Sequence, residues 1–186
     1  MKGLLTALVA LAVSVPAWGQ TTAQSEATVR IQAARFTVRV TSGSLTFPNA
    51  TLTGRDQVLT ASATPTFEVI DARGDVRSGW RITLTASDLT GPEGARLPSG
   101  ALRCRATGGV VQAVAGVPVD PAGGPRETDL AAPLTGGLTV LSARPGFGMG
   151  TYLYQPAPAA FELSVPASAP AGDYRGSLVA NLVVGP

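Results

Sequence analysis

The stretch DARGDVRSGW, from Asp71 to Trp80, holds the densest group of charged side chains in this sequence. Guanidinium groups form strong hydrogen bonds with carboxylates, and an indole ring offers a broad apolar surface with one polar edge. Together such groups are suited to bind a ligand that carries acids and sugar rings. The candidate binding residues are Asp71, Arg73, Arg77, Trp80 and Arg81.

The same stretch also has the composition of a tight turn. Asp71 and Asp75 can accept hydrogen bonds from nearby backbone N–H groups, and the two glycines tolerate a positive φ. At the surface, Asp71 can pair with Arg73, and Asp75 with Arg77. The Arg-Gly-Asp triplet inside the turn is too short a match to indicate an integrin ligand, so we interpret it as a coincidence.

The residues after the turn alternate between apolar and polar side chains. Trp80, Ile82 and Leu84 share one face, while arginine and threonine occupy the other. This period predicts a half-buried strand. Because a tryptophan in such an apolar row usually packs in the interior, the pattern favours a core position for Trp80 and leaves ligand contact as the alternative.

Catalytic chemistry has few candidates here. The sequence has no histidine, which removes the usual general base and the common zinc ligand sets. The glycine-rich run RPGFGMG lacks the lysine and the following helix of a phosphate loop, so its glycines indicate turns. Asp71 and Asp75 lack the acid density of a calcium loop. We predict a non-enzymatic protein with no cofactor and no metal, and keep glycoside hydrolysis by two carboxylates as the enzyme alternative.

Cys104 is the single cysteine of the chain. A lone cysteine in an exported protein has no partner for an internal disulfide. In the stretch LRCRA the apolar residues alternate with arginines. The thiol is therefore expected on the apolar face of a strand, where it is buried as a small hydrophobic group rather than exposed as a reactive one.

The N-terminal residues have the order of a secretory signal peptide. Lys2 supplies the positive charge, residues 3–15 form an apolar run, and Ala17-Trp18-Gly19 has small residues at the cleavage site. The apolar run is about 13 residues, shorter than the roughly 20 that span a bilayer. We expect a signal peptide at residues 1–19, a polar leader at 20–27 and one domain at 28–186. The mature protein is then secreted to the cell surface or cell envelope, a periplasm included, and has no membrane span.

The charge balance gives no support for a nucleic-acid partner. The chain has 14 basic and 12 acidic residues, and its only lysine, Lys2, lies in the predicted signal peptide. Proteins that bind nucleic acids usually present a strongly basic patch. No run of basic residues occurs here, so we expect no nucleic-acid binding.

After the predicted signal peptide the sequence shows the pattern of an all-β protein. Short stretches rich in β-branched and aromatic residues alternate with clusters of Gly, Pro, Ser and Asp, which is typical of strands joined by turns. About nine to eleven such strands predict a single β-sandwich, Ig-like or jelly-roll-like. The candidate strands are residues 29–40, 44–47, 57–63, 66–71, 80–84, 102–106, 110–114, 138–143, 150–154, 159–165 and 173–184.

Some of the connections can be predicted as well. The apolar phase slips at Ala33-Ala34, which indicates a β-bulge in the first strand. Thr107-Gly108-Gly109 separates two short strands and predicts a hairpin. Residues 87–100 and 115–137 have the composition of loops, and the second is long enough to carry function.

Two parts of the chain resemble the signature blocks of the WxL surface-domain family. In FEVIDARGDVRSGWRITLTASDL, an Asp-x-Arg-Gly turn leads to Trp80-Arg81-Ile82, at the place of the first Trp-x-Leu motif. In FELSVPASAPAGDYRGSLVANLVVGP, a Leu-x-Val-Pro segment and the Gly-x-Tyr turn that contains Tyr174 precede Ala180-Asn181-Leu182, at the place of the second motif. The run GFGMGTYLY is similar to the glycine-rich run before the second block.

This resemblance implies an attachment module that holds an exported protein non-covalently on cell wall peptidoglycan, as at Gram-positive surfaces, or on another envelope polysaccharide. Two positions depart from the motifs, with Ile82 in place of leucine and Ala180 in place of the second tryptophan. If the motif tryptophans contact the wall, Ala180 removes a contact. If they are core residues, Ala180 changes only the packing, and the fold carries over.

A different class of function is the alternative to wall binding. A structural subunit of a surface filament or surface layer would assemble by adding its polar leader as a strand to the sheet edge of a neighbour. That neighbour would be another copy of the chain or another surface protein.

Overall fold

The computed structural model describes residues 29–185. The predicted signal peptide (1–19) and leader (20–27) lie outside the described residues. Gln32–Pro186 forms one compact unit, and Val29–Ile31 belong to a separate N-terminal unit. In the described part the helical segments are single turns of 3-10 helix, η1 (Pro92–Gly94), η2 (Ser99–Ala101) and η3 (Pro158–Ala160). No helix found there is long and apolar enough to cross a membrane.

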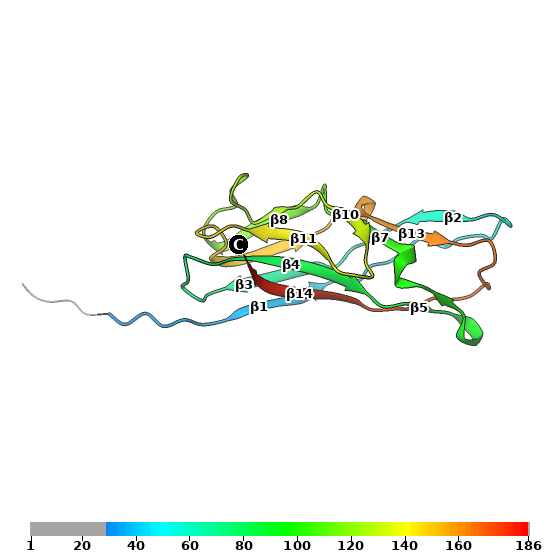
Figure 1. The fold of residues 1–186 in the computed structure, drawn as a ribbon, viewed down its shortest axis with the longest axis horizontal. Helices are drawn as coiled ribbons and strands as arrows, with labels where there is room; N and C mark the ends of the chain where they lie inside the picture. The colour runs from blue at the N-terminus through cyan, green and yellow to red at the C-terminus, as the bar shows by residue number, and fades with distance from the viewer. Residues whose placement is uncertain (1–28, 186) are drawn as a thin grey trace, which may run out of the picture. The chain divides into compact units, whose positions relative to one another are not determined.

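Two antiparallel sheets of four strands each make up one side of the compact unit. The first sheet, in the order β1-β3-β12-β8, consists of β1 (Phe36–Ser42), β3 (Thr66–Asp71), β12 (Gly150–Gln155) and β8 (Val110–Gly116). The second sheet, in the order β10-β7-β13-β2, consists of β10 (Ala131–Pro133), β7 (Leu102–Arg105), β13 (Phe161–Val165) and β2 (Gln57–Thr60). In Figure 1 the second sheet lies to the right of the first.

These two sheets form one layer whose strands are interrupted at a common level. The chain runs from β2 into β3, from β7 into β8 and from β12 into β13, so the order β3-β12-β8 repeats as β2-β13-β7. Proline and glycine residues explain these interruptions. Proline lacks the N–H that a β-ladder needs, and glycine lets the backbone bend through a positive φ, as at Gly108 (78°). The Thr64 hydroxyl joins two of the interruptions by donating to Pro156 O at 2.6 Å. The interruptions are residues 61–65, 106–109 and 156–160.

The hairpin predicted at Thr107-Gly108-Gly109 is therefore wrong. β7 pairs with β10 and β13, whereas β8 pairs with β12, and no residue of β7 is paired with β8. The glycines let the chain bend and run on into the next sheet instead of reversing it. A local pattern does not separate these two outcomes, because the strands that pair with β7 and β8 lie much later in the chain.

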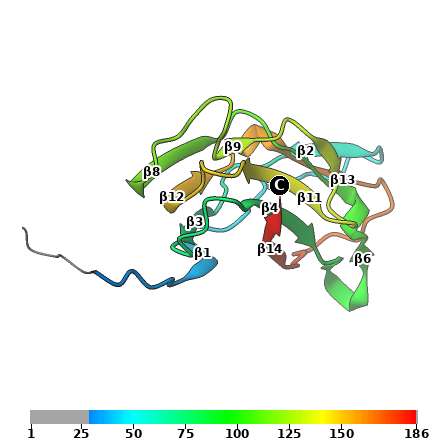
Figure 2. The ribbon, with the colours of Figure 1, turned by 60° about the vertical axis from the view of Figure 1, so that its left-hand side comes forward.

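The opposite layer is the third sheet, in the order β14-β4-β11-β9. It consists of β14 (Leu178–Gly185), β4 (Gly79–Ala86), β11 (Leu138–Ala143) and β9 (Arg126–Glu127). A short pair, β5 (Leu89–Thr90) with β6 (Arg96–Leu97), lies outside the three sheets. Figure 2 shows the strands of the first sheet beside those of the third. The predicted all-β sandwich is confirmed.

The core lies between the layers and is built from alternate residues of their strands. The largest fully buried side chains are Phe67, Tyr152, Tyr154 and Phe161 from the interrupted layer, and Trp80, Ile82, Leu84, Val140 and Leu141 from the third sheet. The Trp80 and Tyr152 rings, with centroids 6.2 Å apart, pack against each other and join the third sheet to the first. The alternation predicted for Trp80, Ile82 and Leu84 is confirmed.

Strand bounds agree best with the sequence where the apolar alternation is regular. β3 and β11 coincide with the strands predicted at 66–71 and 138–143. The strand predicted at 44–47 is reduced to one bridge, from Thr46 to Ala63. The two predicted loops contain the short strands β5, β6, β9 and β10, because isolated ladder pairs of two or three residues leave no detectable period in the sequence.

The first strand differs from its prediction. It begins at Phe36 rather than at residue 29, because its partner β3 ends at Asp71, directly opposite Phe36. Before Phe36 the pairing is limited to Ala34 and Arg35, which form backbone hydrogen bonds with Ala72. The register shift falls between Val40 and Ser42, so the bulge predicted at Ala33-Ala34 is wrong.

Cys104 on β7 is buried, as its alternation with arginines predicted. Burial, and to a smaller extent the charge of Glu127, raises the pKa of the thiol to about 12. Since the thiolate is the reactive form, we expect a disulfide reagent such as DTNB not to label the folded protein at mildly alkaline pH. After unfolding in guanidinium it should label one thiol per chain. Rapid labelling of the folded protein would contradict this placement.

Candidate ligand-binding surface

Asp71 and Arg73 form a part-buried ion pair, not the surface pair that the sequence suggested. The Asp71 side chain is 2% exposed and that of Arg73 is 16% exposed. Arg73 Nε and Nη2 donate to Asp71 Oδ1 and Oδ2 at 2.9 and 2.8 Å, and the guanidinium lies 3.9 Å above the Phe36 ring. The hydrogen bonds to Asp71 raise the pKa of Arg73. The Asp71 carboxylate is therefore buried, and the partly buried guanidinium of Arg73 is bound to it.

Asp75 holds the turn that follows this pair. Its Oδ1 accepts a hydrogen bond from the Arg77 backbone N–H at 2.9 Å, and Gly74 has a φ of 69°. Hydrogen bonds from the Ser78 side chain, and then from the Arg77 backbone, lower the pKa of Asp75. Their contribution to stability is present at neutral pH and is lost as the pH falls through that lowered pKa. The ion pair expected between Asp75 and Arg77 does not form among the described residues. The Arg77 side chain is exposed.

Trp80, near the start of β4, has no exposed surface. Its Nε1 donates to Gly148 O at 2.9 Å. A Cβ atom on Gly148 would clash with the same Nε1, so the glycine-rich run passes over the indole because residue 148 has no side chain. Trp80 is a core residue, as its alternation favoured. A ligand at the surface reaches Trp80 only if the sandwich opens.

The two segments that resemble Trp-x-Leu motifs lie side by side. β4 and β14 pair antiparallel over eight residues without a register shift, and Ile82 lies directly opposite Leu182. Because side chains alternate along a strand, Ile82 and Leu182 face the core, while the middle residues of the two segments, Arg81 and Asn181, point away from it. Arg81 and Asn181 are both exposed.

Ala180, which stands where the second tryptophan is expected, lies on the core side opposite Leu84. It is half-buried and packs against the core cluster. The first positions of both segments, Trp80 and Ala180, therefore serve packing. The exchange of tryptophan for alanine changes the core and leaves the outward surface of β14 unaltered.

Arg81 and Asn181 belong to a larger surface, which we call the outer face of the third sheet. Glu127, the one acidic residue of the four strands, points to the core side, where it accepts hydrogen bonds from the Tyr154 hydroxyl and the Gly109 N–H, each at 2.9 Å. Among the residues of these four strands, the outer face thus carries guanidinium, hydroxyl and amide groups and no carboxylate. Its polar residues are Arg81, Thr83, Thr85, Arg126, Thr139, Ser142 and Asn181.

Ser142 lies between two arginines on this face. It is opposite Arg81 on one side and opposite Arg126 on the other. Neighbouring strands lie about 4.8 Å apart, so the two arginine backbones are roughly 10 Å apart and their long side chains can reach one ligand group. Neither arginine takes part in an ion pair with any residue that the structure describes. This row is the most cationic part of the outer face.

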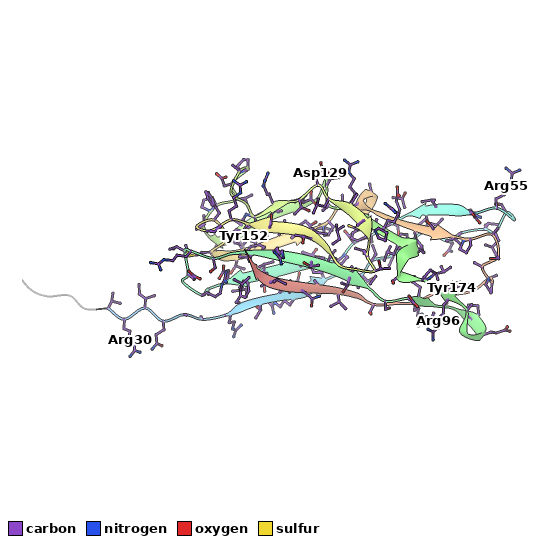
Figure 3. All side chains as sticks on the ribbon, in the orientation of Figure 1. Arg30, Arg55, Arg96, Asp129, Tyr152 and Tyr174 are labelled. Atoms are coloured by element: carbon purple, nitrogen blue, oxygen red, sulfur yellow. The ribbon has the colours of Figure 1, made fainter. Side chains whose placement is uncertain are left out.

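Tyr174 lies apart from these residues. It is half-buried, its hydroxyl donates to Pro170 O at 2.9 Å, and its ring leaves no room for a side chain at Gly91. Figure 3 shows Tyr174 near Arg96, on the other side of the view from Tyr152. Tyr174 therefore supports the connection that leads to β14 and does not join the outer face.

A comparison with protein-family models matches residues 18–186 to the WxL domain, a surface cell wall-binding domain. The chain belongs to the WxL family. Comparisons with curated proteins and with solved structures gave no match. The family places this WxL domain at the cell surface, in association with the cell wall.

The structure divides the predicted binding residues of this WxL domain into separate groups. Asp71 and Arg73 lie at the end of the first sheet, Trp80 is in the core, and Arg81 is on the outer face of the third sheet. Sequence reasoning missed Arg126, which lies in a segment predicted as a loop, and Ser142. The polar positions of the strand at 138–143 were visible, but their neighbours were not.

Proposed function

We propose that this WxL domain binds peptidoglycan or an envelope polysaccharide non-covalently, and without catalysis, through the outer face of the third sheet. The observation that carries the proposal is the row of Arg81, Ser142 and Arg126, in which neither arginine forms an ion pair with any residue that the structure describes. Arginines that have no ion-pair partner among the described residues remain available to an acidic ligand.

The chemistry of the face fits a wall polymer. Arg81 and Arg126 can hydrogen-bond to carboxylates, such as those of wall peptides, and the hydroxyl and amide groups beside them can bind sugar hydroxyls and acetamido groups. Arg77 is exposed in the turn before β4 and stays in the proposed set. Arg73 is not part of the proposed binding set, because its guanidinium is hydrogen-bonded to Asp71. Trp80 packs in the core beneath the strand that carries Arg81.

Replacement of both Arg81 and Arg126 with alanine tests this proposal. We expect the double variant to bind isolated peptidoglycan sacculi at least about tenfold more weakly in co-sedimentation, because hydrogen bonds to charged groups contribute about 1.5–3 kcal/mol each. Since Trp80 is fully buried, binding by the wild type should leave its fluorescence maximum unchanged.

Arg39→Ala is the matched control. It removes an exposed arginine from the opposite layer, where Arg39 pairs with Glu68, and it should pellet like the wild type. If the double variant also pelleted like the wild type, the outer face would not be the binding surface. If the wild type did not pellet, wall binding itself would be wrong for this ligand.

A filament or surface-layer subunit is the second candidate. β8 pairs on one side only, has no charged residue, and exposes Val110 and Val114. Before the register shift in its pairing with β12, this edge can accept a short strand from a neighbour. This function predicts concentration-dependent assembly beyond a dimer that is lost when residues 20–27 are removed. A protein that forms no species larger than a dimer at high concentration counts against it.

A further inference from the structure

β14 is an edge strand that lacks the usual protection of sheet edges. It pairs with β4 without a register shift, and no described strand pairs with its other side. Its sequence, LVANLVVG, contains no charged residue and no proline. Val179, Val183 and Val184 are 45%, 36% and 50% exposed. Charges, prolines and bulges normally keep such an edge from pairing with another chain, and β14 has none of them.

Other edges of the sandwich carry such protection or are short. β1 has the exposed Arg39 and a register shift, the pairing of β8 contains a register shift, and β10 contains Pro133. β9 has two residues and β2 has four. β1 is a neighbour of β14, but it lies in the opposite layer and pairs with β3 (Figure 2). The ladder edge of β14 is therefore not occupied by β1.

The side chains of β14 are arranged symmetrically around Asn181. In an antiparallel pair of two β14 strands centred there, Val179 lies opposite Val183 of the second copy, and Ala180 lies opposite Leu182 of the second copy. On the outer face valine then meets valine, and the two Asn181 amides meet each other. Cross-strand pairs of matched side chains stabilise a sheet. A two-fold interface requires this kind of self-complementarity, because the same patch serves both subunits.

We propose that two copies of this chain associate through β14 about a two-fold axis at Asn181. Within one copy, Arg81 lies opposite Val183 across the sheet. In the dimer this cross-strand row continues into Val179 of the second copy and then into Thr85 of that copy. The two Arg81 residues thus fall in different rows, and no like charges lie opposite each other. The interface is closed, since each β14 is used once, so assembly stops at the dimer.

This dimer has a consequence that rests on the proposed function. The two third sheets, of four strands each, join into one continuous sheet, and their outer faces lie next to each other on one side. A polymer that binds one set of Arg81 and Arg126 then finds a second set close by. Linked sites of this kind raise the overall affinity without any new contact.

Sedimentation velocity of the mature chain, in the absence of wall material, tests the dimer independently of wall binding. We expect a concentration-dependent dimer for the wild type. Asn181→Lys should sediment as a monomer, because it places two ammonium groups directly opposite each other. Thr37→Lys is the matched control, since it adds the same charge to the exposed part of edge strand β1, and it should remain dimeric.

A cross-linking experiment keeps the proposal testable if the lysine variant folds poorly. Asn181→Cys should form a covalent dimer with a short bis-maleimide, because directly opposed Cβ atoms lie about 4.5–5.5 Å apart. Thr37→Cys should not, and the buried Cys104 should not contribute. A monomeric wild type at all concentrations would overturn the proposal. So would a dimer that persists in Asn181→Lys, or an Asn181→Cys variant that does not cross-link.

Discussion

Replacement of Trp80 with alanine is expected to lower the free energy of unfolding by about 3–5 kcal/mol, the range for a large aromatic side chain removed from a core. Trp80 has no exposed surface and packs against Tyr152 across the two layers. The variant also leaves Gly148 O without its N–H donor. The buried carbonyl then adds a desolvation cost to the cavity.

Urea unfolding followed by circular dichroism measures this change, since the variant lacks the one tryptophan of the folded core. Trp80→Phe is the control, because it keeps much of the volume and loses the hydrogen bond. It should cost less and should still pellet with sacculi while folded. A folded Trp80→Phe protein that no longer binds the wall would contradict a packing role for this motif position. A loss below about 1 kcal/mol in Trp80→Ala would contradict the burial.

Replacement of Asp71 with alanine is expected to lower the free energy of unfolding by about 1–3 kcal/mol, because the partly buried guanidinium of Arg73 then lacks its hydrogen-bond acceptor. Arg73 would keep its guanidinium over the Phe36 ring and lose both hydrogen bonds to Asp71. Replacement of the pair together, as Asp71→Leu with Arg73→Met, should recover much of the loss, since no unpaired charge remains.

Urea unfolding followed by Trp80 fluorescence measures these variants. Asp173→Ala is the matched control, because Asp173 pairs with Arg175 at 3.9 Å where both side chains are almost fully exposed. Such surface pairs contribute little, so this variant should unfold close to the wild type. Equal stabilities of Asp71→Ala and Asp173→Ala would mean that the Asp71–Arg73 pair does not stabilise the fold.

The family and the class of fold could be predicted from local patterns. The alternation of Trp80, Ile82 and Leu84 identified a half-buried strand and a core tryptophan, and the same regularity produced the bounds of β3 and β11. These features follow from neighbouring residues alone, since a strand with one buried face must alternate. The two motif segments led to the family on the same local grounds.

The binding surface could not be predicted in this way. Arg73 and Arg81 are equivalent in the sequence, as arginines on either side of one turn, yet the first is bound to Asp71 and the second points away from the core. Arg126 became a candidate only because β9 lies beside β11, which places it opposite Ser142. No residue near Arg126 in the chain indicates that partner.

The sequence by itself therefore determined the strands with regular alternation, the buried thiol of Cys104 and the membership of the WxL family. The tertiary structure alone decided which strands are neighbours. It made Thr107-Gly108-Gly109 a bend rather than a hairpin, and it placed Ile82 opposite Leu182. The physical reason is that side-chain alternation is a local property of one strand, whereas the register between strands depends on how distant segments share a core.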